Sequence, residues 1–157
     1  MIATAGLPAA VLRISRELPA GKGACYVYRA REKQMSIYDY LPPYHGELSG
    51  RNRWVQLAAA IDWDRFEKSY STLFAPGGKA AIPARIALGC RVIQMHYRAS
   101  DREVVALVRE SPYLQYFLGM ETFSDQLPFS ARTVARFRER IPDRAVRPAV
   151  RLLRSFR

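Results

Sequence analysis

Hydrophobic residues recur every three or four positions through the middle of the chain, which is the period of a helix with one buried face. Phe66, Tyr70 and Leu73 form the first clear row and predict a helix from Trp63 to about Phe74. No well-patterned run of strands competes with these rows, so the pattern predicts an all-α fold. A longer row predicts a largely buried helix that starts near Pro83, and it consists of Ile82, Ile86, Cys90, Ile93 and Tyr97.

Capping residues mark where the helices begin and end. Asp62 is typical of an N-cap, and Pro76 with Gly77 and Gly78 stops the helix that Asp62 opens. Ser100 and Glu103 form a capping box, in which each side chain satisfies a backbone N–H group of the first turn. Three short helices are predicted in the second half of the chain, over residues 101–110, 112–118 and 131–141.

The two ends of the chain lack this regularity. Residues 1–34 have no sustained period and are interrupted by proline and glycine, and only Cys25–Tyr28 is typical of a short strand. Residues 142–157 are rich in arginine. We therefore predict a disordered N-terminal extension at 1–34, a small helical domain at 35–141, and a poorly ordered basic tail at 142–157.

The predicted helix over 131–141 has one apolar face and one arginine face. At about 100° per residue, Val134, Phe137 and Ile141 fall on the same side, and the arginines lie beside and opposite them. As the last of three short helices, it has the place of the reading helix in a helix-turn-helix unit. The candidate DNA-binding residues are Arg132, Thr133, Arg136, Arg138 and Arg140.

These side chains predict two kinds of DNA contact. In a major groove, Arg132, Thr133 and Arg136 at the start of the helix reach base edges, whereas Arg140 and Arg138 meet phosphates farther along. Arginine suits both roles, because its planar fork binds phosphate oxygens or the edge of guanine. Arg138 has an alternative role, which is to pair with an acid of residues 101–127. The helix as a whole has the alternative of a solvated charged face without a partner.

Composition supports an anionic partner. The chain has 25 Lys and Arg against 14 Asp and Glu, which gives a net charge of +11. The excess is local, since residues 101–127 carry −3 and residues 128–157 carry +7. A binding face at the C-terminal end is therefore favoured over a uniformly basic surface. No segment approaches the ~20 apolar residues of a membrane span, and no secretory leader is evident. We therefore expect no membrane partner.

Several blocks of the helical region occur in a characteristic order and spacing. They are Ile82–Gly89, Tyr97–Val105, Ser111–Gly119, Leu127–Ser130 and Arg136–Ile141. Together they resemble the N-terminal domain of bacterial insertion-sequence transposases of the fifth family, whose catalytic domain carries the DDE set of acids. The resemblance covers about residues 35–141, and it implies a cytoplasmic, nucleoid-associated bacterial protein.

This resemblance implies a helical domain that recognises terminal inverted repeats, followed in the family by a ribonuclease-H-like domain with metal-binding Asp, Asp and Glu. The chain ends sixteen residues after Ile141, so the resemblance implies a transposase truncated before its catalytic domain. Neither flank matches the family, and we interpret both as out-of-frame or misassigned translation. Met1 and Met35 remain alternative starts, and sequencing the locus tests this interpretation.

The residues themselves predict neither catalysis nor a metal or cofactor site. Two-metal phosphoryl transfer needs carboxylates brought close together on a rigid scaffold, whereas most acids here have a local role as helix caps or solvent-facing charges. Cys25, Cys90, His45 and His96 lack the short spacing of metal ligands. We predict a buried Cys90, a helix-end His96, and aromatic residues that belong to the core.

Three functions follow from these observations. The first is a DNA-binding domain of a truncated transposase, which recognises terminal inverted repeats in double-stranded DNA without catalysing strand transfer. The second is a protein-association module that inhibits intact transposase by forming mixed oligomers, or that associates with itself. The third is a non-functional gene remnant. Salt-dependent gel shifts distinguish the first from the others, and co-purification with a full-length relative distinguishes the second.

Overall fold

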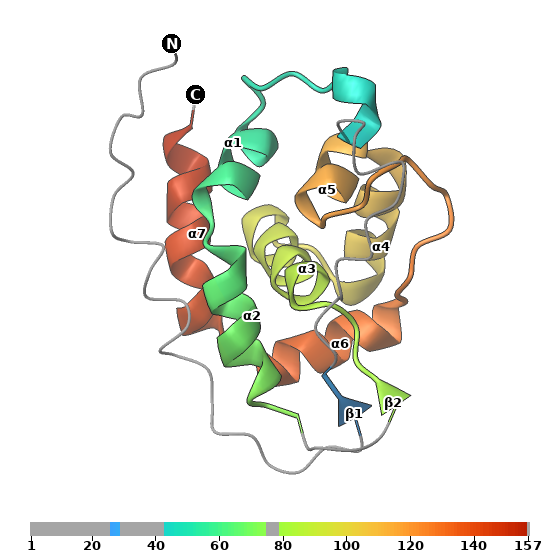
Figure 1. Ribbon diagram of the computed structural model, residues 1–157, viewed down its shortest axis with the longest axis vertical. Helices are drawn as coiled ribbons and strands as arrows, with labels where there is room; N and C mark the ends of the chain where they lie inside the picture. Colours follow the sequence, from blue (N-terminus) through green and yellow to red (C-terminus); the bar gives the residue numbers. More distant parts are fainter. Residues whose placement is uncertain (1–25, 29–42, 75–78, 157) are drawn as a thin grey trace.

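The computed structural model describes residues 26–28, 43–74 and 79–156, and these residues form a helical domain (Figure 1). The all-α prediction is confirmed. The only strands among the described residues are the two-residue β1 (Tyr26–Val27) and β2 (Lys79–Ala80), which pair in parallel. A short 3-10 helix, η3, covers Pro43–Gly46. The α-helices of the described residues are α1 (Arg53–Ala60), α2 (Trp63–Ser71), α3 (Ala84–Tyr97), α4 (Asp101–Glu110), α5 (Pro112–Phe117), α6 (Ala131–Arg140) and α7 (Asp143–Ser155).

Helix α3 lies at the centre of the domain, with α2, α4, α6 and α7 packed against it (Figure 1). Ten of the eleven residues of α3 from Ala84 to Gln94 are buried, which confirms the predicted buried helix. The last member of the predicted row is not buried, because Tyr97 is 42% exposed. Gly89 allows a close approach to Leu118, since a Cβ at position 89 would lie 2.2 Å from a methyl carbon of Leu118 and would force that side chain to move.

The predicted caps are present. The Ser100 backbone N–H donates to the Glu103 carboxylate at 2.7 Å, and the Glu103 backbone N–H faces the Ser100 hydroxyl at 3.4 Å. Asp62 accepts from the Arg65 backbone N–H at 3.0 Å, so α2 begins where the sequence predicts. Gly119 adopts a φ of 82° just after α5, a backbone conformation that glycine adopts without strain.

The N-terminal flank differs from the prediction at Tyr26–Tyr28. These residues form β1 and the residue after it, and the Tyr28 ring packs edge-on against Tyr70 with ring centroids 5.8 Å apart. The Tyr28 hydroxyl also accepts from the Ala84 backbone N–H at 3.3 Å. A disordered extension is therefore wrong for this segment, and β1 confirms the predicted strand. The rest of the predicted extension lies outside the described residues.

The prediction of a poorly ordered tail at 142–157 is wrong. Residues 143–155 form α7, which packs against α3 and α1. Pro148 sits inside this helix and removes one helical hydrogen bond, at a cost of roughly 3 kcal/mol or more. Burial offsets that cost, because a fully buried Val or Leu side chain contributes about 1.5–3 kcal/mol. The buried residues of α7 are Ala145, Val146, Ala149, Val150, Leu152 and Leu153.

The three helices predicted over 101–110, 112–118 and 131–141 are confirmed as α4, α5 and α6, to within one residue at their ends. Helix α4 packs against both of the others. Their connection differs from that of a tight helix-turn-helix, in which about 3–4 residues join the two helices. Here the whole segment 118–130 separates α5 from α6, so α6 is placed by its packing on α3 and α4.

Candidate nucleic-acid interface

Helix α6 is fixed in orientation by one buried face and a capped start. Val134, Phe137 and Ile141 are at most 1% exposed, which confirms the predicted apolar face. At the start of the helix, the Ser130 backbone N–H faces the Thr133 hydroxyl at 3.4 Å. Rotating the helix about its axis would expose its core residues, so the opposite face points outward. Thr133 therefore has a structural role in this cap, besides the contact with base edges that the sequence predicts for it.

The predicted arginines of α6 differ in exposure. Arg132 and Arg138 are exposed, whereas Arg136 and Arg140 are partly buried. Arg132 lies near Arg102, because both line one hollow where α4 and α6 begin. The start of α6 therefore brings two arginines from separate helices to the same part of the surface. The other residues that line this hollow are Ser100, Asp101, Ala131 and Ala135.

The two arginines at the borders of the apolar face contact other parts of the domain, Arg138 at α4 and Arg140 at Phe74 just after α2. An Arg138 nitrogen lies 3.5 Å from an Asp101 carboxylate oxygen, so the alternative role predicted for Arg138 is confirmed. The Arg140 guanidinium lies over the Phe74 ring, 4.9 Å from its centroid. Burial raises the pKa of the Tyr70 hydroxyl, and the positive charge of Arg140 opposes that rise. Arg140 thus stabilises the packing of α6 beside α2, an interaction that helical periodicity alone did not indicate.

A buried polar network joins α6 to α7 and to the centre of the fold. Arg91 of α3 is 3% exposed and donates to the Ile141 carbonyl at 3.2 Å, to the Gln94 side chain and to the Asp143 carboxylate. The Gln94 amide donates in turn to Asp101 at 2.6 Å. Burial lowers the pKa of Arg91, and the charge of Asp143 opposes that shift. This network holds the α6–α7 junction in place, and the sequence analysis missed it.

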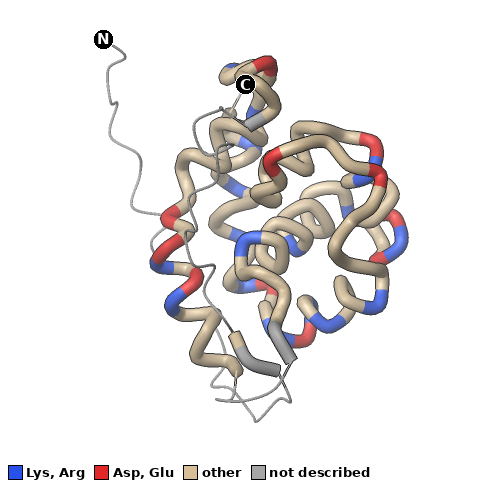
Figure 2. The backbone as a smooth tube through the Cα atoms, turned by 45° about the vertical axis from the view of Figure 1, so that its right-hand side comes forward, with Lys and Arg blue, Asp and Glu red and all other residues tan. Residues whose placement is uncertain are grey.

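Helix α7 carries a second arginine face that the sequence analysis also missed. At about 100° per residue, its four arginines fall within one arc of about 80°, opposite the buried residues. All four are exposed. Figure 2 marks the charged positions along the backbone of both helices. The signal was available in the sequence, because apolar residues of the segment recur at helical spacing. The four residues are Arg144, Arg147, Arg151 and Arg154.

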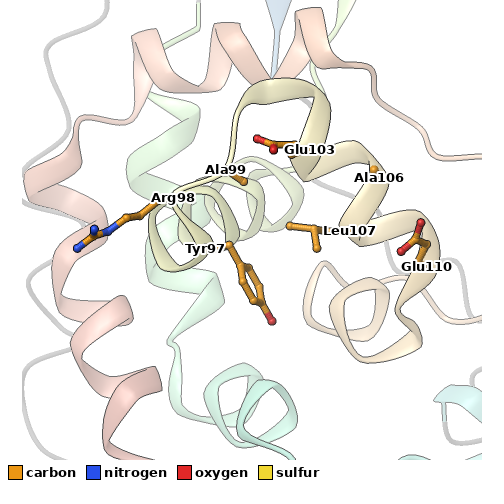
Figure 3. A pocket seen from close by; sticks show the side chains of 7 residues that line it. All are labelled: Tyr97, Arg98, Ala99, Glu103, Ala106, Leu107 and Glu110. Carbon is orange, nitrogen blue, oxygen red and sulfur yellow. The ribbon is translucent and has the colours of Figure 1, made fainter.

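A hollow between the end of α3 and α4 has the wrong charge for a phosphate site. Tyr97 and Arg98 lie on one side of it, and Glu103 and Glu110 project from α4 on the other (Figure 3). The Arg98 side chain points away from these acids, toward the outside of the hollow (Figure 3). Two carboxylates at its rim disfavour a polyanion, so we place no nucleic-acid contact here.

The other aromatic and candidate metal-ligating residues of the sequence have the following places in the structure. Trp54 and Phe117 belong to the core, with exposures of 4% and 0%, and Cys90 is fully buried. His96 is the penultimate residue of α3. Within residues 26–28, 43–74 and 79–156, no group of three His, Cys, Asp or Glu side chains has the arrangement of a metal site. No helix in this part of the chain combines the length and apolar character required to cross a membrane.

Comparison with known proteins points to one family. The family described as Transposase domain (DUF772) matches residues 38–140. A relative from Rhizobium meliloti, described as uncharacterized protein ORF8 in the nfe locus, is 34% identical over 94 residues. The aligned region covers 60% of this chain and 45% of that protein, so the chain spans less than half the length of its relative. No solved structure matches.

Proposed function

Because the chain belongs to the transposase domain family DUF772, we propose that it binds double-stranded DNA through the exposed face of α6 and recognises terminal inverted repeats. The observation that carries this proposal is the orientation of α6. The side chains of its apolar face, Val134, Phe137 and Ile141, are at most 1% exposed. Its arginines lie on the rest of the helix surface. A helix held in this way presents its arginines to a groove without rearrangement, and rigid presentation lowers the entropic cost of binding.

The contacts within the domain divide the roles of the α6 residues. Arg138 and Arg140 contact Asp101 and Phe74, so they hold the helix as well as adding positive charge beside a duplex. Arg132 and Arg136 are the proposed base-reading residues, with Thr133 between them. Arg102 of α4 lies beside Arg132 and suits a backbone phosphate next to the bases that are read.

Binding to tiled DNA tests this proposal. Overlapping duplexes that cover the DNA on both sides of the gene are compared with scrambled duplexes of equal length by fluorescence anisotropy. We expect tighter binding to fragments that contain an inverted repeat. Arg132→Ala with Arg136→Ala should cost about 1–3 kcal/mol per lost base contact and remove that preference. Equal binding of the parent chain to all duplexes would contradict the proposal.

We further propose that these residues bind DNA without cutting or joining it. Two acids at the start of α4, which packs on α6, have structural roles, since Asp101 contacts Arg138 and Gln94, and Glu103 caps α4. The purified chain should neither nick nor join duplexes that contain the terminal inverted repeats when magnesium or manganese is present. Metal-dependent cleavage that persists through stringent purification would contradict this.

A second candidate function is association with another transposase chain. Phe123 is 48% exposed and lines a hollow with Tyr44, Leu48 and Tyr113, and exposed aromatic residues are enriched in protein interfaces. Under this alternative, the chain forms mixed assemblies with a full-length relative. Light scattering and co-purification test it, with Phe123→Ser as the variant and Phe129→Leu, a change in the core, as a control for effects of fold stability.

A further inference from the structure

Helix α7 presents a continuous positive face along one side of the domain. Its exposed arginines recur at spacings of three, four and three residues, and no acid follows Asp143 in the helix. Like charges at these spacings repel one another and destabilise an isolated helix by about 0.2–0.5 kcal/mol per pair. The fold retains this repulsion at its surface, which is the arrangement expected where an anionic partner neutralises the charges.

We propose that the arginine face of α7 is a second DNA contact, which binds the phosphate backbone of the duplex that α6 reads. This inference rests on the proposed function of α6. The face is suited to backbone contact and not to base reading, because guanidinium groups spread along a helix surface meet phosphates without entering a groove.

The dimensions of the face fit several phosphates. Arg144 and Arg154 are separated by about 15 Å along the helix, at ~1.5 Å per residue. Each DNA strand carries one phosphate per ~3.4 Å of duplex axis, so this length matches a stretch of about four base pairs. Four arginines over that distance suit an extended polyanion better than a single small anion.

The face continues beyond the end of α7. Helix α1 packs beside α7, and its first residue, Arg53, is exposed. Burial is the main cause that lowers the pKa of His96 in α3, and the positive charges of Arg53 and Arg154 lower it further. Arg53 and Arg154 therefore both lie within electrostatic range of His96, so the start of α1 adds a positive charge near the C-terminal end of α7.

The packing of α7 argues for DNA over an anionic membrane. A helix that binds a membrane surface inserts its apolar face between lipids. The apolar face of α7 is already covered by α3 and α1, and Ala145, Val146, Ala149 and Leu153 are each 0% exposed. The exposed surface of α7 after Asp143 is dominated by its four guanidinium groups, and these suit a phosphate polymer.

The junction between α6 and α7 makes the two surfaces one unit. The Ile141 carbonyl at the end of α6 and the Asp143 carboxylate at the start of α7 both accept from the buried Arg91. A single side chain of the central helix thus fixes the end of one helix relative to the start of the next. A duplex held by α7 is therefore presented to α6 in a defined orientation.

A charge-matched pair of variants tests the inference. Arg147→Gln with Arg151→Gln removes two charges from α7, and Lys68→Gln with Arg109→Gln removes two exposed charges from α2 and α4. Affinity for a scrambled duplex is measured by anisotropy at several salt concentrations, and circular dichroism verifies folding. The slope of log affinity against log salt should become about two units less steep for the α7 variant, because each phosphate contact contributes about 0.9. The control should keep the parent slope.

The outcomes separate this inference from the proposed function. A slope that is unchanged in the folded α7 variant, or changed equally in the control, overturns the second contact. Loss of the phosphate contact should leave the preference for repeat-containing over scrambled duplexes intact, whereas failure of the proposed function appears as no such preference in the parent chain. Binding of the parent to vesicles that contain phosphatidylserine, with no α7 effect on DNA, would assign the face to a membrane and overturn the inference.

Discussion

Helices α6 and α7 follow one another in the chain and have similar compositions, but their arginines make different contacts. Both are amphipathic, rich in arginine and buried on one side. Helix α6 lies within the region that matches the family, whereas α7 begins after residue 140, where that match ends. Two arginines of α6 contact other helices, and α6 also contains Glu139. In α7 all four arginines are exposed, and its one acid contacts the buried Arg91.

This difference shows why counting arginines does not identify a DNA contact. Arg138 and Arg140 lie at the borders of a buried face, where they reach a carboxylate and an aromatic ring of neighbouring helices. Arg132, on the side of the helix opposite the buried face, is exposed. The position of an arginine relative to the buried face therefore decides how far it stabilises the fold and how far it remains available to a partner.

The largest expected effect lies at the junction of the two helices. Arg91→Leu leaves the Ile141 carbonyl and the Gln94 side chain without their donor in the core. Each buried unsatisfied group costs about 1–3 kcal/mol, so the loss of a partner for two groups should lower the free energy of unfolding by about 2–6 kcal/mol. Chemical denaturation measures this. If Arg91→Leu is as stable as the parent, the junction is not held by Arg91 and the two helices are independent.

An exposed arginine gives the matched control for that experiment. Arg109→Leu on α4 makes the same chemical change at the surface, where substitutions away from special features stay within about 0.5 kcal/mol. Asp143→Asn is a milder change at the junction, because it keeps an acceptor for Arg91 and removes the charge. It should lie between the two, and a loss as large as that of Arg91→Leu would show that the charge of Asp143 dominates.

A substitution of Arg140 tests whether this arginine, at the border of the apolar face of α6, stabilises the folded domain. Arg140→Ala removes a cation from the face of Phe74 and should lower the free energy of unfolding by about 1–2 kcal/mol, the range for a partly desolvated cation–π contact. A double-mutant cycle with Phe74→Leu isolates the pair. The sequence predicts a phosphate contact for Arg140, so an unchanged stability with a shallower salt slope would return it to the DNA-binding surface.

Arg138 should show a smaller, salt-dependent effect. Its side chain is 57% exposed, and exposed ion pairs contribute about 0.2–1 kcal/mol. Arg138→Ala should therefore lower stability slightly at low salt, and the difference from the parent should shrink as salt screens the pair. DNA affinity should change less than for Arg132→Ala. The reverse order, with affinity most affected at position 138, would place Arg138 among the DNA contacts.

The smallest effect concerns acid stability at the start of α4, beside the predicted DNA face. Hydrogen bonds from Ser100 lower the pKa of the Glu103 carboxyl in the folded state. The stabilisation from ionised Glu103 is present above the ordinary glutamate pKa of about 4.3, and it is lost as the pH falls through the lowered folded value. Glu103→Gln should therefore weaken the loss of stability below that pH. Thermal melts of both chains across this pH range measure the difference, and identical acid profiles would contradict the prediction.

Local signals in the sequence predicted much of the fold. Ser100 with Glu103, Asp62 and the apolar rows of α2, α3 and α6 were sufficient, because caps and period depend on neighbours within one or two turns. The Tyr26–Val27 strand was also predicted. Its pairing with Lys79–Ala80 was not, since no local signal specifies a partner so far along the chain.

The candidate surface was predicted in part. The face of α6 follows from periodicity, and the contact of Arg138 with an acid was foreseen. Helix α7 was not predicted, because a segment so rich in arginine is typical of a disordered tail, although its apolar residues recur at helical spacing. Arg91 was missed for a different reason: its partners Asp143 and Ile141 lie about 50 residues away, so only packing brings them together.

One comparison tests the division of roles between α6 and α7 most directly. The parent, Arg132→Ala/Arg136→Ala, and Arg147→Gln/Arg151→Gln are each titrated with a repeat-containing and a scrambled duplex at several salt concentrations. The account predicts that the α6 variant loses the preference for the repeat, whereas the α7 variant keeps that preference and shows a salt slope about two units shallower. Two folded variants with the same preference and the same slope would contradict it.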